Sequence, residues 1–393
     1  MATSARTPRV AAVLRTEDRV TPLELFFDLV FVLALTQCTA SMAADPTWEG
    51  MARGLLILGV LWWSWVGYAW LTSVVDPEEG IVRFAMFGAM AGLLVAALCV
   101  PEAFDRSALL FAVAYLGVRG AQIVLFLVAS RDTPDLRRSV LGLAVSTAIG
   151  TGLLVGASFA DGALQGAIWA VALLLDMGGP YLFGAEGWKL VPGHFAERHG
   201  LIVIIALGES IVAIGVGAEG LHVDAGVVAA SVLGIAVAAA LWWLYFDIVA
   251  LVAERRLSRA PVGREQNDIA RDSFSYLHFP MVAGIVLVAL GLKKTLEHVD
   301  DPLKAVPAVA MLGGVGLYLL AHVAFRWRNV HRFSVQRLLT AALLAAFVPV
   351  ALELPALATL GFVAAALAAL IAYETVRFAE LRERLRHQLS ESA

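Results

Sequence analysis

Two stretches decide the fold of this chain: residues 306–325 read VPAVAMLGGVGLYLLAHVAF, and residues 356–377 read ALATLGFVAAALAALIAYETVR. Each is almost wholly apolar and about 20 residues long, the length of a helix that crosses a lipid bilayer. The rest is similar: of 393 residues 60% are hydrophobic and 16% charged, and the mean hydropathy is +0.79. A soluble domain is roughly 45–50% apolar and about 25% charged. The composition therefore excludes a soluble globular, disordered or nucleic-acid-binding protein.

Similar runs recur along the chain and predict an all-α polytopic membrane bundle of about 12 transmembrane helices. The expected spans are 22–44, 51–73, 82–100, 108–130, 138–159, 163–184, 200–218, 225–253, 273–292, 306–325, 335–354 and 356–377. With a cytoplasmic N-terminus, 23 of the 29 Lys and Arg residues fall on the cytoplasmic side. The positive-inside rule requires this asymmetry. We therefore expect both termini in the cytoplasm.

The two halves of the chain resemble each other in three places, which occur in the same order. The aligned pairs are 29–37 with 201–209, 61–63 with 241–243, and 91–98 with 283–290. This order favours two parallel six-helix repeats, a plan known among transporters, although duplication is also a simple way to build any bundle. The predicted organisation is a cytoplasmic segment 1–21, repeats 22–190 and 191–378, and a cytoplasmic tail 379–393.

The cysteines and the N-terminal residues predict neither a disulfide framework nor a removable signal peptide. Cys38 and Cys99 both lie in apolar runs, so we expect no disulfide framework and no thiolate metal site. No short apolar core with a small-residue cleavage site precedes Thr21, so no removable signal peptide is predicted.

Charged residues inside the spans are the candidates for function, because burying a charge in the bilayer is costly. Glu24 and Asp28 are four residues apart and share one helix face. Two such carboxylates resist ionising together, so one is expected to hold a proton and to serve as a relay or general acid. The alternative is that both pair with basic residues such as Arg198 or Arg271.

The seventh and ninth spans carry the other candidates for a proton relay. Glu209 lies deep in the seventh span beside a stripe of small residues, and it is expected to be protonated or bonded to polar neighbours. His278 lies a turn or so into the ninth span, and Pro280 is expected to kink that helix. A relay histidine and a satisfied buried histidine are both compatible with this position.

Basic and acidic residues around the same spans predict a salt-bridge hub at the inner surface. Its expected members are His194, Glu197, Arg198, Arg271 and Asp272. A metal reading of His194, Glu197 and His199 is disfavoured, because histidines five residues apart lie on roughly opposite helix faces. We expect no metal and no cofactor.

The second span is rich in aromatic residues, which have two interpretations. They could form an interfacial belt, or a cation–π wall for an organic cation or carbocation. The candidate substrate-binding residues are Trp62, Trp63, Trp65, Tyr68 and Tyr276.

Several motifs together resemble the bacterial low temperature requirement A family. They are Thr21–Val32, Pro101–Phe104, His194–Ser210, Tyr245–Asp247 and Tyr276–Gly284. The resemblance implies a multi-pass protein of the bacterial inner membrane. It implies no mechanism, but the motif positions include Glu24, Asp28, Glu209 and His278.

Two functions follow as hypotheses. The first is a secondary transporter of a small solute, for which protons are a candidate coupling ion; no Gly-x4-Gly-Lys-Ser/Thr motif points to ATP-driven transport. The second is a membrane enzyme on a lipid-soluble isoprenoid, such as a terpene cyclase that starts by protonation from Glu24, Asp28 or Glu209. A sensor or assembly factor is a third reading. The expected partners are the lipid bilayer and a small or lipid-soluble substrate, with no nucleic acid and an unknown oligomeric state.

Overall fold

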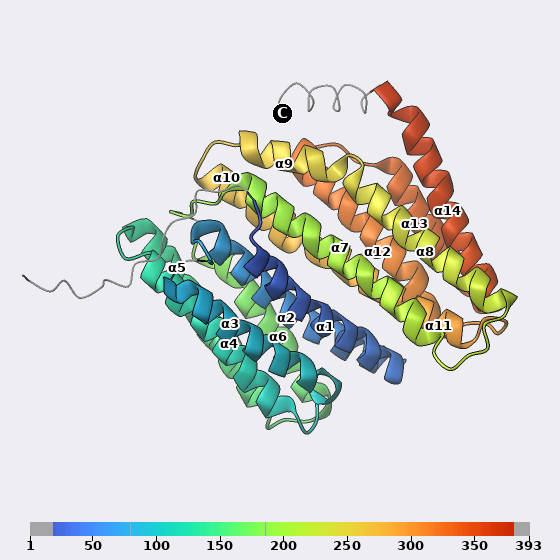
Figure 1. The fold of residues 1–393 in the computed structure, drawn as a ribbon, viewed down its shortest axis with the longest axis horizontal. Helices are drawn as coiled ribbons and strands as arrows, with labels where there is room; N and C mark the ends of the chain where they lie inside the picture. The colour runs from blue at the N-terminus through green and yellow to red at the C-terminus, as the bar shows by residue number, and fades with distance from the viewer. Residues whose placement is uncertain (1–18, 79, 185, 381–393) are drawn as a thin grey trace, which may run out of the picture. The chain divides into compact units, whose positions relative to one another are not determined.

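The computed structural model describes residues 19–78, 80–184 and 186–380, and this part of the chain is helical without a β-strand (Figure 1). The predicted all-α membrane bundle is confirmed. Most of the two predicted cytoplasmic end segments, residues 1–18 and 381–393, lies outside the described residues. The helices are α1 (Pro22–Ala44), α2 (Trp48–Val74), α3 (Gly80–Cys99), α4 (Ala108–Ala129), α5 (Pro134–Ala157), α6 (Gly162–Leu182), α7 (Pro192–Gly217), α8 (Ala225–Phe246), α9 (Val249–Arg259), α10 (Arg264–Ile269), α11 (His278–Glu297), α12 (Ala305–Val330), α13 (Val335–Ala351) and α14 (Ala356–Arg377).

Eleven helical segments within the described residues are long and apolar enough to cross a membrane. The eleventh expected span, 335–354, corresponds to α13, which is apolar but only 17 residues long. The helix ends at Ala351, four residues before Pro355, which cannot donate a backbone hydrogen bond. The eighth expected span is also interrupted, because α8 ends at Phe246 and α9 begins at Val249.

The ninth span departs from a regular helix earlier than expected. Residues Ala270–Tyr276 form a π-helical segment between α10 and α11. Pro280 is the third residue of α11, in the first turn, where backbone N–H groups have no intrahelical acceptor. The irregularity therefore precedes Pro280 and lies beside His278, and π segments are frequent at functional sites.

The chain divides into two compact units, each assembled from several stretches. Of the described residues, the first unit holds those between 19 and 37, between 55 and 198, and between 260 and 271. Within it, α3 packs on α4, α4 on α5, and α5 on α6. The close approach of α5 and α6 depends on Gly150, where a Cβ atom would lie 2.9 Å from the Asp176 Cβ atom.

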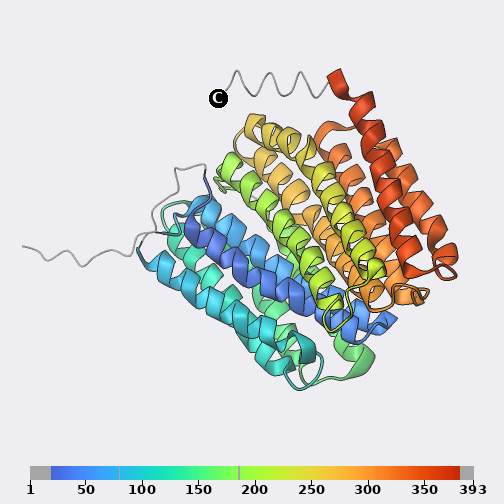
Figure 2. The same ribbon diagram turned by 45° about the vertical axis from the view of Figure 1, so that its right-hand side comes forward.

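The second unit holds the described residues 38–54, 199–259 and 272–380. Its centre is the pair α11 and α12, and α12 packs on α13 while α14 packs on α8 and α13 (Figure 2, where α12 to α14 run from orange to red). The backbones of α11 and α12 nearly touch: a Cβ atom on Gly314 would lie 2.7 Å from the Gly284 carbonyl oxygen. Small residues at crossings are the usual basis of helix association in membranes.

Candidate functional site

The candidate site of the first unit begins at the first turn of α1, where Thr21 and Glu24 form a capping box. The Glu24 Oε2 atom accepts hydrogen bonds from the Thr21 backbone N–H (2.9 Å) and hydroxyl (3.2 Å), and the Thr21 Oγ1 atom accepts from the Glu24 N–H (3.4 Å). Pro22, in the first helical position, needs no such partner. The cap fixes the Glu24 carboxylate at the start of α1 and leaves Oε1 for other partners.

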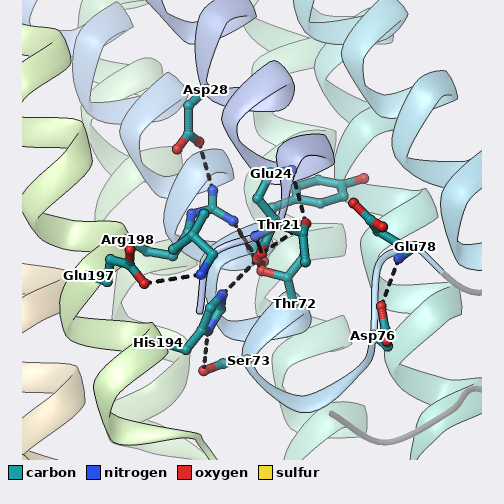
Figure 3. A network of polar contacts seen from close by, with 12 residues as sticks. Thr21, Glu24, Asp28, Thr72, Ser73, Asp76, Glu78, His194, Glu197 and Arg198 are labelled. Carbon is teal, nitrogen blue, oxygen red and sulfur yellow. Dashed lines mark hydrogen bonds and ion pairs between the residues drawn. The ribbon is translucent and has the colours of Figure 1, made fainter. Parts of the chain in front are cut away.

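Arg198, on α7, binds both carboxylates of α1 (Figure 3). Its Nη1 atom lies 2.9 Å from Glu24 Oε1, and its Nη2 atom lies 2.7 Å from Asp28 Oδ1. All three side chains are fully buried. The planar guanidinium offers several donors in a fixed fork, so a single arginine can join two carboxylates one helical turn apart. The predicted alternative, that Glu24 and Asp28 pair with Arg198, therefore describes the observed geometry.

Asp28 is held asymmetrically. Its Oδ1 atom accepts hydrogen bonds from Arg198 and from the Trp65 Nε1 atom, the latter at 2.8 Å. Its Oδ2 atom is buried and has no hydrogen-bond partner among the described residues. A buried polar atom without a partner is rare in proteins and calls for an explanation.

His194 completes the network, together with two hydroxyl residues that the sequence did not single out. Its Nε2 atom lies 2.8 Å from Glu24 Oε1, and its Nδ1 atom lies 3.2 Å from the Ser73 Oγ atom. Thr72 accepts a hydrogen bond from Arg198 Nη1 at 3.1 Å and donates to the Tyr68 carbonyl oxygen. Neither hydroxyl stands out in the sequence, because Ser and Thr are common in spanning helices.

The predicted salt-bridge hub is divided in the structure. His194 and Arg198 belong to the network on α1, whereas the exposed Glu197 accepts a hydrogen bond from the Val20 N–H (3.0 Å). Arg271 pairs with Asp268 at 3.0 Å. Asp272 lies in the second unit and pairs with Arg328 at 2.9 Å.

The four aromatic residues of α2 that are substrate-binding candidates are buried, so these four do not form an interfacial belt, whereas Trp48 is 55% exposed and Trp70 half-buried. Trp62, Trp65 and Tyr68 have no exposed surface, and Trp63 is 3% exposed. The Trp62 and Trp65 rings stack with centroids 5.1 Å apart, and the Arg198 guanidinium lies 5.5 Å from the Trp65 ring centre. The Tyr68 hydroxyl donates to the Val118 carbonyl oxygen.

A second buried ion pair in the first unit joins α4, α5 and α6. Arg119 Nη2 lies 2.8 Å from Asp176 Oδ1, and Thr147 donates to the same oxygen at 3.0 Å. Because the pair and Thr147 link three packed helices, this geometry indicates a structural role.

In the second unit, His278 lies in an aromatic cluster next to the π segment. Its Nδ1 atom lies 3.0 Å from the Ser273 carbonyl oxygen, and its Nε2 atom lies 2.8 Å from the Tyr245 hydroxyl. Both ring nitrogens thus have partners, which is the geometry of a satisfied buried histidine. Tyr276, at the end of the π segment, is half-buried. Glu209 is 2% exposed on α7 and neighbours the buried Ser210.

Comparison with known proteins identifies the family. The family model described as bacterial low temperature requirement A protein matches residues 19–372. The chain belongs to this family. It is also 32% identical over 306 residues to an uncharacterized protein of Rhizobium meliloti (strain 1021), covering 75% of this chain and 74% of the relative. No solved structure matches the chain.

The chain is therefore a multi-pass membrane protein of the bacterial low temperature requirement A family, and the matched region contains the whole Arg198 network and the His278 cluster. Within the described residues no group of three or more His, Cys, Asp or Glu side chains is placed to hold a metal ion. The chemistry that the Arg198 network offers is charge and proton exchange, because it joins two carboxylates, an imidazole and a guanidinium out of contact with solvent.

Proposed function

We propose that this member of the low temperature requirement A family is a proton-coupled secondary transporter of a small solute in the bacterial inner membrane. The observation that carries the proposal is the asymmetric Asp28 carboxyl. Its Oδ1 atom is bound by Arg198 and Trp65, while its buried Oδ2 atom has no partner among the described residues. A carboxylate oxygen in that condition is a favourable place for a proton, because protonation removes a costly buried charge.

Proton uptake at Asp28 would alter the hold of α1 on α7. With Asp28 ionised, Arg198 is attracted by two carboxylates; with Asp28 neutral, Glu24 and Thr72 remain as its partners. The N-terminal parts of the two helices would then be joined less tightly, which gives a proton-dependent element of the kind that alternating access needs. A carrier couples its solute to protons when the two states of such an element differ in solute affinity.

Liposomes containing the purified full chain and a trapped pH dye test the proposal. Amino acids, sugars, nucleosides and quaternary amines are added outside one at a time. We expect at least one of these solutes to acidify the lumen, and we expect Asp28→Asn to abolish the acidification. The matched control is Asp135→Asn, an exposed aspartate in the first turn of α5.

Two results would overturn the proposal. One is the absence of solute-dependent proton movement for every member of the panel. The other is full coupling in Asp28→Asn with solute uptake unchanged, since the proton would then bind elsewhere.

A membrane enzyme for an isoprenoid is the second candidate, because the candidate acid touches the aromatic wall. The Trp65 ring lies against Phe31 (centroids 6.4 Å apart) and Trp62, and its Nε1 atom binds Asp28. An acid beside indole rings could protonate an alkene and shelter the resulting cation. Formation of a cyclised product from added isoprenoid, without any solute flux, would favour this function over transport.

A further inference from the structure

A cavity of about 290 Å³ lies in the second unit among α9, α12, α13 and α14. Part of its lining is apolar and includes Val249, Val252 and Phe378. The lining also includes three arginines: Arg326 on α12, Arg332 in the segment that joins α12 to α13, and Arg337 on α13. The volume is near the lower end of the range of small-molecule pockets, which is roughly 300–1,000 Å³.

The charges of this lining do not balance. Arg337 is neutralised by Glu374, because its Nε and Nη2 atoms lie 2.9 and 2.8 Å from the two carboxylate oxygens. Gln336 donates to the same carboxylate at 3.0 Å. Arg326 donates to a neutral group, the Ser334 hydroxyl, and Arg332 is exposed. The lining, which holds three arginines and a single carboxylate, therefore favours an anion.

His322 adds a second requirement. It lines the cavity and is 1% exposed, and its Nδ1 atom lies 2.8 Å from the Tyr318 carbonyl oxygen. A carbonyl can only accept, so Nδ1 carries the hydrogen and Nε2 of the neutral ring is an acceptor. No described residue forms a hydrogen bond with this Nε2 atom. A ligand that satisfies it must bring a hydrogen-bond donor, such as a hydroxyl group.

From these contacts we infer that the cavity binds a phosphate group that carries a hydroxyl, with Arg326 and Arg332 on the anionic oxygens and His322 Nε2 accepting from the hydroxyl. Basic pockets between membrane helices bind acidic lipid headgroups in this way. The glycerol headgroup of a phospholipid and soluble hydrogen phosphate share this chemistry. The apolar residues of the lining favour the lipid, since they can cover its glycerol backbone. This binding is independent of the proposed proton coupling.

The test uses the full chain in nanodiscs of phosphatidylcholine and measures bound lipid by native mass spectrometry. Two anionic probes of equal charge are compared: phosphatidylglycerol, which has headgroup hydroxyls, and phosphatidylethanol, which has none. We expect the wild type to prefer phosphatidylglycerol over both other lipids. We expect the double variant Arg326→Gln/Arg332→Gln to weaken its binding by about tenfold or more.

The matched control removes two arginines that do not line the cavity. In Arg106→Gln/Arg138→Gln, both parent side chains are about four-fifths exposed, 81% and 79%, and we expect wild-type binding. Excess inorganic phosphate that displaces the lipid would identify soluble phosphate as the source, whereas undiminished lipid binding would identify the headgroup.

Two results would overturn the inference. If the cavity double variant retains phosphatidylglycerol as well as the control does, the arginines do not bind it. If the wild type binds phosphatidylethanol as tightly as phosphatidylglycerol, the hydroxyl has no partner at His322. The second comparison is made on the wild type and so does not depend on the folding of any variant.

Discussion

Arg198 and Asp28 are 170 positions apart in the chain, yet their side chains meet at 2.7 Å with neither exposed to solvent. Arg198, the seventh residue of α7, thereby joins that helix to α1. A buried charge pair contributes less through its own attraction than through the penalty that follows when one partner is removed. The pair is therefore best tested by removing one charge and then both.

Arg198→Gln is expected to destabilise the protein by about 3–5 kcal/mol, because Glu24 and Asp28 then face each other without a cation. The measurement is the midpoint of denaturant unfolding in detergent micelles. The stability of Arg198→Lys is expected to lie between that of the wild type and that of Arg198→Gln. A single ammonium group cannot match the guanidinium fork that spans both carboxylates. A stability unchanged in Arg198→Gln would contradict the observed pairing.

Arg119 and Asp176 are expected to behave as a structural pair only. Asp176→Ala leaves the buried Arg119 guanidinium without its carboxylate and is expected to cost about 3–5 kcal/mol. The double variant Arg119→Met/Asp176→Leu is expected to regain most of this loss, because no buried charge remains. The proton flux of the double variant in liposomes should equal that of the wild type. A loss of flux at wild-type stability would show that this pair takes part in function.

The sequence predicts the membrane helices and the residues of the site far better than it predicts their grouping. Hydropathy locates the spans because every spanning helix must bury its backbone in hydrocarbon. It also marks Glu24, Asp28 and Arg198, since charge is rare there. Hydropathy does not say which charged residues lie close together in the fold. Arg271 and Asp272 are adjacent in the chain, yet Arg271 pairs with Asp268 and Asp272 pairs with Arg328.

Local irregularities are also beyond the sequence signal. The π segment at 270–276 contains no proline or glycine that would announce it, whereas Pro280, which suggests a kink, fits into the first turn of α11. Thr72 and Ser73 could not be selected either, because hydroxyl residues in spanning helices commonly bond to their own backbone.

The Tyr245 hydroxyl is expected to stabilise the second unit through His278. Tyr245→Phe removes the 2.8 Å contact with His278 Nε2 and leaves that buried nitrogen without this partner. The expected loss is about 1–3 kcal/mol, the usual cost of an unsatisfied buried group. Tyr373→Phe on α14 is the control, since Tyr373 is 54% exposed. Equal unfolding midpoints for the two variants would show that the hydroxyl contributes nothing.

Two adjacent glycines of α12 give the sharpest test of the helix packing. A Cβ atom on Gly314 would lie 2.7 Å from the Gly284 carbonyl oxygen and 2.9 Å from the Leu287 Cβ atom, both on α11. On Gly313 the nearest atom would be a Val309 methyl carbon at 3.6 Å, an ordinary contact. Gly314→Ala is therefore expected to push α11 and α12 apart and to cost about 1–3 kcal/mol.

Gly313→Ala adds the same methyl group one residue earlier, and it is expected to be neutral or to stabilise the protein by up to about 1 kcal/mol through helix propensity. Unfolding midpoints of the two variants in the same detergent decide the matter. Because the substitutions are chemically identical and adjacent, any difference between them reports the backbone approach of α11 to α12. If Gly314→Ala were as stable as Gly313→Ala, the two helices would lie farther apart than the structure places them.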